Sequence, residues 1–277
     1  PDKGQILING KDVVSQMPAQ RNVAMVFQQY SLYPHLSVRD NLAFPLRSPM
    51  RCTPEDEINR KVGEVADILQ ISHKMDNKAT ELSGGEMQRV SIGRALVRNP
   101  QVYLMDEPLS SLDAKLRSDL RIQLKRIQAS MGATILYVTH DQVEAMTMAT
   151  HVGVLDEGRL VQFGSPRDIY EDPVSIYAAG RLGSPKMNVL PASLFPGAPN
   201  KAASIGLRPE HIQIGIGVKT EVVRVERLGD QTRLHLKMNG VEIMTLTEPH
   251  TILKKGDAVA ISPKEPLYFD TNGNRLK

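Results

Sequence analysis

The most informative part of the chain reads Leu82–Ser83–Gly84–Gly85–Glu86–Met87–Gln88–Arg89. Ser83 and Glu86 have the spacing of a capping box, which predicts that a helix begins here. Gly84 and Gly85 would leave backbone N–H groups uncovered at the positive end of that helix, where an anion can bind. Capping boxes also open many helices that bind nothing, so the box alone indicates only structure.

A second feature is the apolar run Val102–Tyr103–Leu104–Met105, which ends in Asp106 and Glu107. Such a run is typical of a buried parallel strand, and open α/β sheets hold ligands at the carboxyl ends of their strands. Buried strands rarely end in two unpaired acids, because burying a charge is costly. The acid pair and the glycine-exposed helix start together point to nucleotide chemistry, with one part holding phosphate and the other holding a metal ion.

Two further apolar strands end in polar residues. Val23–Phe27 leads into Gln28, and Ala133–Thr139 leads into His140. Alone, each would be interpreted as an ordinary polar residue that meets solvent. Because the carboxyl ends of parallel strands meet at one edge of a sheet, we expect Gln28, Asp106 and His140 to belong to a single site.

Shorter signals predict how the surrounding segments fold. Asn9–Gly10 is a favoured hairpin-turn pair. Thr53 before Pro54 is typical of a helix start with the threonine as N-cap, and Asp113 would cap a later helix. Each of the two helices is expected to bury an apolar stripe at helical spacing, made of Ile58, Val62, Val65 and Leu69 in the first and of Leu116, Leu120, Leu124 and Ile127 in the second.

The composition limits the class of protein. At 277 residues the chain can hold one large domain and one small one. Its formal net charge of +3 is too weak to indicate nucleic-acid binding by itself. The single cysteine, Cys52, cannot form an internal disulfide and favours a reducing compartment. With no run of about 18 apolar residues and no signal peptide, a membrane role would have to come through a partner.

The pattern changes after Gly183–Ser184–Pro185, where short strands and turns begin. Upstream of that point, a hairpin across Asp156–Glu157–Gly158 and a helical stretch from Ser165 to about Arg181 would close an α/β domain over residues 1–182. Downstream, residues 183–277 predict a small all-β barrel of the oligonucleotide/oligosaccharide-binding type. Its expected strands are Thr220–Arg227, Thr232–Met238, Val241–Thr247 and Asp257–Ser262.

Taken together, these motifs resemble the ATP-binding subunits of ABC transporters. The resemblance is carried by L-S-G-G-E-x-Q-R and D-E-P, and by Phe27–Gln28, Ser110–Asp113 and Thr139–Asp141. Tyr30–Val38 is most similar to importers of the maltose and glycerol-3-phosphate type, and Ile205–His211 resembles the start of their regulatory part. The fold this implies is a P-loop NTPase-like ABC ATPase domain, with a helical subdomain at about 30–98, followed by the β module.

The resemblance also implies a role for each strand end. Asp106 would bind Mg²⁺ through a water molecule, and Gln28 would contact the Mg²⁺ ion and the attacking water. Glu107 would be the catalytic base, and His140 would touch the γ-phosphate of ATP. Asp113 would contact the opposite subunit's site.

The resemblance implies partners as well. Ser83, Gly84 and Gly85 would face the γ-phosphate held by a second copy, so the active unit would be a homodimer with two shared sites. Tyr30–Pro49 would line the groove that receives a short helix of a transmembrane permease subunit. The subunit would lie at the cytoplasmic side of the plasma membrane, depend on a solute-binding protein indirectly, and bind no nucleic acid.

One family motif is missing from the sequence. There is no G-x-x-x-x-G-K-[ST], the loop that holds the β- and γ-phosphates. We expect that this loop lies upstream of Pro1, that the chain is truncated before it, and that the 277 residues alone bind ATP poorly and hydrolyse it negligibly.

Three alternatives to a sugar importer remain open. An ABC importer ATPase for polyamine, iron or phosphonate is only mildly disfavoured by Leu32–His35. A soluble ABC protein acting on ribosomes or DNA would carry coiled-coil or basic insertions, and none is visible. A non-catalytic binding protein built on the β module would not need the intact pair Asp106–Glu107.

Overall fold

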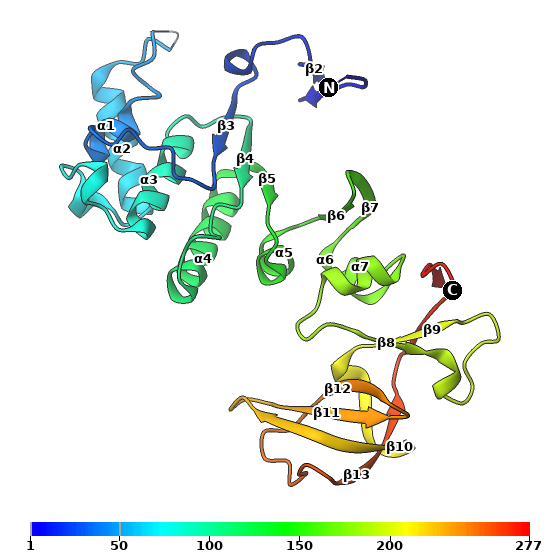
Figure 1. The fold of residues 1–277 in the computed structure, drawn as a ribbon. Coiled ribbons are helices and arrows are strands. Elements are labelled where there is room, and N and C mark those ends of the chain that lie inside the picture. Colours follow the sequence, from blue (N-terminus) through cyan, green and yellow to red (C-terminus); the bar gives the residue numbers. More distant parts are fainter. Residues whose placement is uncertain (1, 50) are drawn as a thin grey trace. The chain divides into compact units, whose positions relative to one another are not determined.

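The computed structural model describes residues 2–49 and 51–277. By contacts the chain divides into two compact units, residues 1–144 and 145–277 (Figure 1). The predicted boundary after residue 182 rests on the change of sequence pattern at that point, and it stays a prediction.

The first unit contains a parallel sheet of three strands in the order β3–β4–β5, formed by Val23–Val26, Val102–Asp106 and Thr134–Val138. Val26 pairs with Met105, and Met105 pairs with Tyr137, so all three strands run in register toward one edge. Figure 1 shows the three strands side by side. This arrangement confirms that Gln28, Asp106 and His140 follow neighbouring strand ends.

The sheet is buried on one face only. Alternate residues such as Ala24, Tyr103 and Met105 are buried, whereas Leu136 is 62% exposed and Val138 is 50% exposed. The prediction that β5 is a buried strand is therefore wrong, since Thr134, Leu136 and Val138 are exposed and Ile135 and Tyr137 are half-buried. The physical reason is that, among the described residues, side chains pack against one face of the strand and leave the other face uncovered.

Three helices pack together beside the sheet: α1 (Val38–Ala43), α2 (Glu55–Ile68) and α3 (Gly84–Leu96). The predicted stripe of α2 is confirmed, since Ile58, Val62, Val65 and Leu69 are all buried. The predicted N-cap is displaced by one residue: Pro54 occupies the cap and Thr53 lies outside the helix. Proline fits there because a cap residue has extended backbone geometry and needs no intrahelical N–H bond.

A buried asparagine fixes the loop before α1. Asn41 is fully buried, and its Oδ1 accepts a hydrogen bond from Tyr33 N at 2.9 Å. Its Nδ2 donates to the carbonyl oxygens of Tyr33, Leu36 and Ser37 at 3.0, 3.3 and 3.0 Å. This side chain therefore takes the place of secondary structure in holding the loop Tyr33–Ser37.

The helix after β4, α4 (Ala114–Met131), begins as predicted. Asp113 is its N-cap and accepts a hydrogen bond from Leu116 N at 3.0 Å. Its buried stripe is Leu120, Leu124 and Ile127, while Leu116 is half-buried. The remaining elements of this part are the hairpin β1 (Leu7–Ile8) and β2 (Lys11–Asp12), which turns at Asn9–Gly10 as predicted, and the short 3-10 helices Pro18–Gln20, Ser72–Lys74 and Ala79–Glu81. Helix α5 spans Gln142–Met148.

The second unit begins with the predicted hairpin, β6 (Val152–Asp156) and β7 (Arg159–Gly164). The expected helical stretch up to Arg181 is two helices, α6 (Pro166–Glu171) and α7 (Ile176–Arg181). Pro173 explains the break, because a proline disfavours helical geometry at the residue before it. Asp172 accordingly has φ −129° and ψ 65°.

The all-β module is confirmed, and its strands form two antiparallel sheets. One sheet has the order β12–β11–β10–β13, from Val241–Thr247, Thr232–Met238, Ile212–Arg227 and Ala258–Pro263. The other has the order β15–β14–β9–β8, from Arg275–Leu276, Leu267–Phe269, Ser204–Leu207 and Asn188–Pro191. Short 3-10 helices lie at Ala192–Leu194 and Pro209–His211. The two sheets share a core that includes Leu190, Ile205, Val222 and Leu234.

Strand β10 is longer than predicted. It starts at Ile212 rather than Thr220, and its pairing with β13 shifts between Ile214 and Val218. The two glycines in this irregular stretch, Gly215 and Gly217, have φ near +110°. Such backbone interrupts the alternating pattern that identifies a strand in a sequence.

Arg208 joins the helices of the second unit to its sheets. Its buried guanidinium donates to the carbonyl oxygens of Ala179 at 3.2 Å, Leu182 at 2.6 Å and Tyr170 at 2.9 Å. It also lies 3.8 Å from the centre of the Tyr170 ring. These bonds explain why residues 145–182 pack with the β module.

Candidate functional site

Residues from three strand ends meet around one carboxylate. Glu107 follows β4, and its Oε1 lies 3.0 Å from Nδ1 of His140, which follows β5. Its Oε2 accepts a hydrogen bond from Nε2 of Gln28, which follows β3, at 3.2 Å. The grouping was predicted for Gln28, Asp106 and His140; Gln28 and His140 do meet at the sheet edge, but around Glu107 rather than Asp106.

The backbone of Glu107 is held in an unusual conformation. Its φ of +44° lies in the left-handed region, which residues other than glycine rarely adopt. Its N–H donates to Val138 O at 3.0 Å, and its carbonyl accepts a hydrogen bond from Ser110 Oγ at 3.0 Å. Strain of this kind persists where the surroundings fix it, and it is frequent at functional sites.

His140 is set apart from an ordinary surface histidine by its neighbour. Its side chain is 71% exposed. The hydrogen bond to the Glu107 carboxylate and the negative charge of that group raise the pKa of His140 above its usual value. The imidazole is therefore cationic over a wider pH range than that of a free histidine, and it holds one oxygen of Glu107.

Asp106 is the last residue of β4 and is exposed. Its carboxylate has no bonding partner among residues 2–49 and 51–277. Within the same residues there is no cluster of three His, Cys, Asp or Glu side chains able to enclose a metal ion. A free carboxylate at a strand end fits Mg²⁺, which takes one or two carboxylates and fills its other positions with phosphate oxygens and water.

The start of α3 forms the predicted capping box. Glu86 N donates to Ser83 Oγ at 3.4 Å, and Glu86 Oε2 accepts from Ser83 N at 2.8 Å. That backbone hydrogen bond lowers the pKa of Glu86, and Lys74 lies 3.3 Å from its other oxygen. The helix tip is thus fixed by hydrogen bonds of its own residues.

The two glycines of this tip differ from each other. A Cβ on Gly84 would stand 3.1 Å from the Tyr30 hydroxyl, whereas a Cβ on Gly85 would stand 1.9 Å from Cδ2 of Leu116. Gly85 is buried as a residue, and the expectation that its backbone N–H is open to an anion stays a prediction. It is glycine at least partly because Leu116 packs against its Cα.

Comparison with known proteins decides the family. The family model described as ABC transporter matches residues 1–110. The sn-glycerol-3-phosphate import ATP-binding protein UgpC of Ruegeria pomeroyi is 46% identical over 295 residues, covering 99% of this chain and 83% of that protein. The chain belongs to the ABC transporter family.

Other relatives agree with this assignment. The trehalose/maltose import ATP-binding protein MalK of Thermococcus litoralis is 39% identical, covering 100% of this chain and 85% of that protein. Among solved structures, cbiO1 of Clostridium perfringens, part of the ABC transporter complex cbiONQ, matches with a TM-score of 0.57 at 30% identity, covering 62% of this chain and 70% of that one. A TOBE domain model matches residues 205–266. The chain is thus an ABC ATP-binding subunit whose α/β domain is followed by an all-β TOBE regulatory domain.

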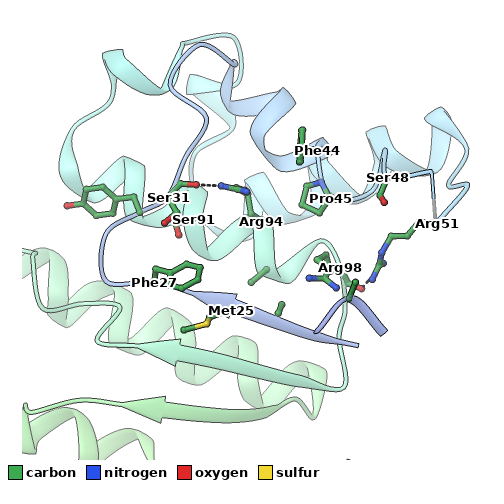
Figure 2. A pocket seen from close by; sticks show the side chains of 14 residues that line it. Met25, Phe27, Ser31, Phe44, Pro45, Ser48, Arg51, Ser91, Arg94 and Arg98 are labelled. Atoms are coloured by element: carbon green, nitrogen blue, oxygen red, sulfur yellow. Dashed lines mark hydrogen bonds between the residues drawn. The ribbon is translucent and has the colours of Figure 1, made fainter. Parts of the chain in front are cut away.

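The structure of this ABC subunit also contains a groove of about 510 Å³ between β3 and the helices α1 and α3. Figure 2 shows Met25 and Phe27 on one side of it, Phe44 and Pro45 on another, and Arg94 hydrogen-bonded to Ser31. Burial lowers the pKa of Arg94. Tyr30, Ser31, Phe44, Pro45 and Ser48 of the segment Tyr30–Pro49, which was predicted to line a groove, are among the residues that line this one.

Sequence reasoning missed the contacts of the loop Ser110–Leu112. Ser110 Oγ lies 3.3 Å from Gln28 Nε2, and Ser111 Oγ lies 3.2 Å from the Tyr30 hydroxyl. Arg117 donates to carbonyl oxygens of the same loop. The only sequence signal was an arginine in the first turn after the Asp113 cap.

None of the helices in the described residues is long and apolar enough to cross a bilayer.

Proposed function

We propose that this chain is the ATP-hydrolysing subunit of an importer for a sugar or a sugar derivative such as glycerol-3-phosphate. The observation that carries the proposal is the Glu107 carboxylate held between Gln28 and His140 at the edge of the sheet. The identity to import ATP-binding proteins for sn-glycerol-3-phosphate, trehalose/maltose and xylose/arabinose supports the class of solute.

In the proposed reaction Glu107 is the base. One of its oxygens accepts a proton from water as the water oxygen bonds to the γ-phosphorus of ATP. The bond from that phosphorus to the bridging oxygen breaks, and ADP leaves. His140 and Gln28 hold the two carboxylate oxygens in place, which lowers the entropic cost of reaching the reactive geometry. His140 also supplies a donor for the γ-phosphate.

Asp106 and Gln28 would hold Mg²⁺ at this edge of the sheet. Bound there, the ion would neutralise negative charge on the phosphates. The free carboxylate of Asp106 supports this assignment.

The active unit we propose is a homodimer. Ser83, Gly84 and Gly85 of one copy would bind the γ-phosphate held by the other, at the positive end of α3. Asp113 would contact the site of the opposite copy. Support comes from the exposure of Ser83 and Asp113.

The groove beside Phe27 and Arg94 is the proposed seat of a short helix from a permease subunit. Its mixed lining of apolar side chains and arginines suits the end of an amphipathic helix. The subunit would then lie on the cytoplasmic face of the plasma membrane, and a solute-binding protein would act on it through the permease.

The test is reconstitution of the complete ABC transporter in liposomes. We expect ATP hydrolysis to rise when sugars or glycerol-3-phosphate are supplied with the solute-binding protein. A response only to polyamine, iron or phosphonate would contradict the solute class. Recovery of the subunit with ribosomes or DNA instead of membrane subunits would contradict the importer assignment.

We further propose that residues 1–277 by themselves bind Mg-ATP weakly, because they contain no G-x-x-x-x-G-K-[ST]. Isothermal titration of this chain with Mg-ATP should show no binding in the micromolar range. Micromolar affinity would contradict the proposal.

A further inference from the structure

Arg117 lies where two loops of the candidate site come together. Arg117 belongs to the first turn of α4. Its Nη2 donates to Leu112 O at 2.8 Å and to Ser110 O at 3.4 Å. Its Nη1 lies 3.4 Å from Oδ2 of Asp141, the residue after His140. One guanidinium therefore bonds both the loop that follows Glu107 and the loop that carries His140.

The acidic partner of this arginine is itself fixed. Asp141 Oδ1 accepts hydrogen bonds from Val143 N at 2.7 Å and Glu144 N at 3.3 Å, as the cap of α5. Its own N–H donates to Thr139 Oγ1 at 3.0 Å. One carboxylate oxygen thus anchors the loop to α5, and the other faces Arg117.

The loop on the other side is equally connected. Ser110 Oγ donates to the carbonyl of Glu107 and lies 3.3 Å from Gln28 Nε2. A shift of this loop would therefore move the backbone of Glu107. Since Asp141 adjoins His140, the distance between Glu107 and His140 depends on both loops.

We propose that Arg117 is a positioning residue that holds the Ser110–Leu112 loop and Asp141 at a fixed spacing, and thereby sets the contact between Glu107 and His140. This inference rests on the proposed ATP hydrolysis. Arg117 touches neither Glu107 nor His140 in the described contacts, so its effect is indirect.

The chemistry calls for arginine rather than lysine. The planar guanidinium presents separate donors to a carbonyl and to a carboxylate at once, whereas an ammonium is a single point charge. Arg117 Nε is buried without a hydrogen-bond partner among the described residues, so the Nη atoms alone fix the group.

The test compares R117M and R117K in a complete subunit assembled with its permease, with R121M as the matched control. Arg121 lies one turn further along α4. Its described hydrogen bond goes to Ser118 of the same helix and to neither loop of the site. We expect R117M to lower kcat about 10- to 100-fold with the KM for ATP nearly unchanged, because misplacing a reactive group affects the chemical step. R117K should recover part of kcat, and R121M should match the wild type.

A double-mutant cycle with D141N separates positioning from stability. If the two residues act together, R117M should lower kcat much less in the D141N background than alone. Unchanged kcat in R117M, or a loss of folded protein with full kcat in the folded fraction, would overturn the inference. A wild-type transporter that hydrolyses no ATP would instead overturn the proposed function, so the two failures are distinguishable.

Discussion

Glu107 Oε1 lies 3.0 Å from His140 Nδ1, although the two residues follow different strands. The other oxygen of the same carboxylate is held by Gln28 at 3.2 Å. Two neighbours from adjacent strand ends thus fix both oxygens of this carboxylate, and such positioning lowers the entropic cost of the proposed attack of water on the γ-phosphate of ATP.

Because Glu107 raises the pKa of His140, that pKa can be measured to test the contact between the two side chains. In E107Q the pKa of His140 should fall, because the amide removes the charge-assisted hydrogen bond and the negative charge that raise it. The measurement is an NMR pH titration of the His140 ring. His73, for which no such partner is present among the described contacts, serves as the internal control. A His140 pKa that does not move in E107Q would contradict the contact.

The raised pKa of His140 also makes the stability of the folded protein depend on pH in a definite direction. A histidine whose pKa is raised on folding stabilises the folded state below its unfolded value of about 6.5, and this contribution is lost as pH rises through the folded value. We expect the wild type to lose more stability than E107Q when the pH is raised through this window. Denaturant unfolding at a series of pH values checks this, and parallel curves for the two proteins would contradict it.

Close packing at Gly93 predicts a pair of opposite effects. A Cβ on Gly93 would lie 2.6 Å from Leu42 Cδ2 and 3.0 Å from Leu69 Cδ1, both fully buried. G93A should therefore destabilise the protein by about 1–3 kcal/mol. Gly63, within α2, has open space around its Cβ position, so G63A should stabilise by about 0.5–1 kcal/mol. Urea unfolding measures both, and equal effects would contradict the packing.

Gly85 and Leu116 should be energetically coupled. A Cβ on Gly85 would overlap Leu116 Cδ2, so G85A should destabilise by about 1 kcal/mol or more. In the L116A background the same change should be nearly neutral. A double-mutant cycle of unfolding free energies measures the coupling, and additive effects would show that the two residues do not pack together.

The buried Asn41 should be intolerant of an apolar replacement. N41L leaves Tyr33 N without its partner, and it removes one of two donors from each of the carbonyl oxygens of Tyr33, Leu36 and Ser37. Each buried group left unpaired costs about 1–3 kcal/mol. We expect a large loss of stability with early proteolysis in the Tyr33–Ser37 loop. A variant as stable as the wild type would contradict the role of Asn41.

The sequence predicted those parts of the fold that depend on local chemistry or on strand direction. The capping box at Ser83 and the cap at Asp113 are local hydrogen bonds, so their spacing alone identifies them. The approach of Gln28 and His140 follows from parallel strands, because their carboxyl ends share an edge, although they meet around Glu107 and not around the predicted Asp106.

The rest depends on tertiary contacts that carry no sequence period. The close approach of Leu116 to Gly85 and the bonds of Arg117 to Asp141 join segments from different elements. The exposure of Leu136 depends on which face of the sheet is covered. Strands β8, β9, β14 and β15 are too short to show a reliable alternation.

The most direct test of the account is the rate of ATP hydrolysis by E107Q in a complete subunit assembled with its permease, measured beside E64Q. Glu64 is exposed and, among the described contacts, pairs with Arg60 on α2, so E64Q makes the same chemical change outside the site. The account predicts that E107Q binds ATP, accumulates as a closed dimer and hydrolyses ATP about 10²- to 10⁴-fold more slowly, while E64Q keeps the wild-type rate. A wild-type rate in E107Q would contradict the assignment of Glu107 as the base.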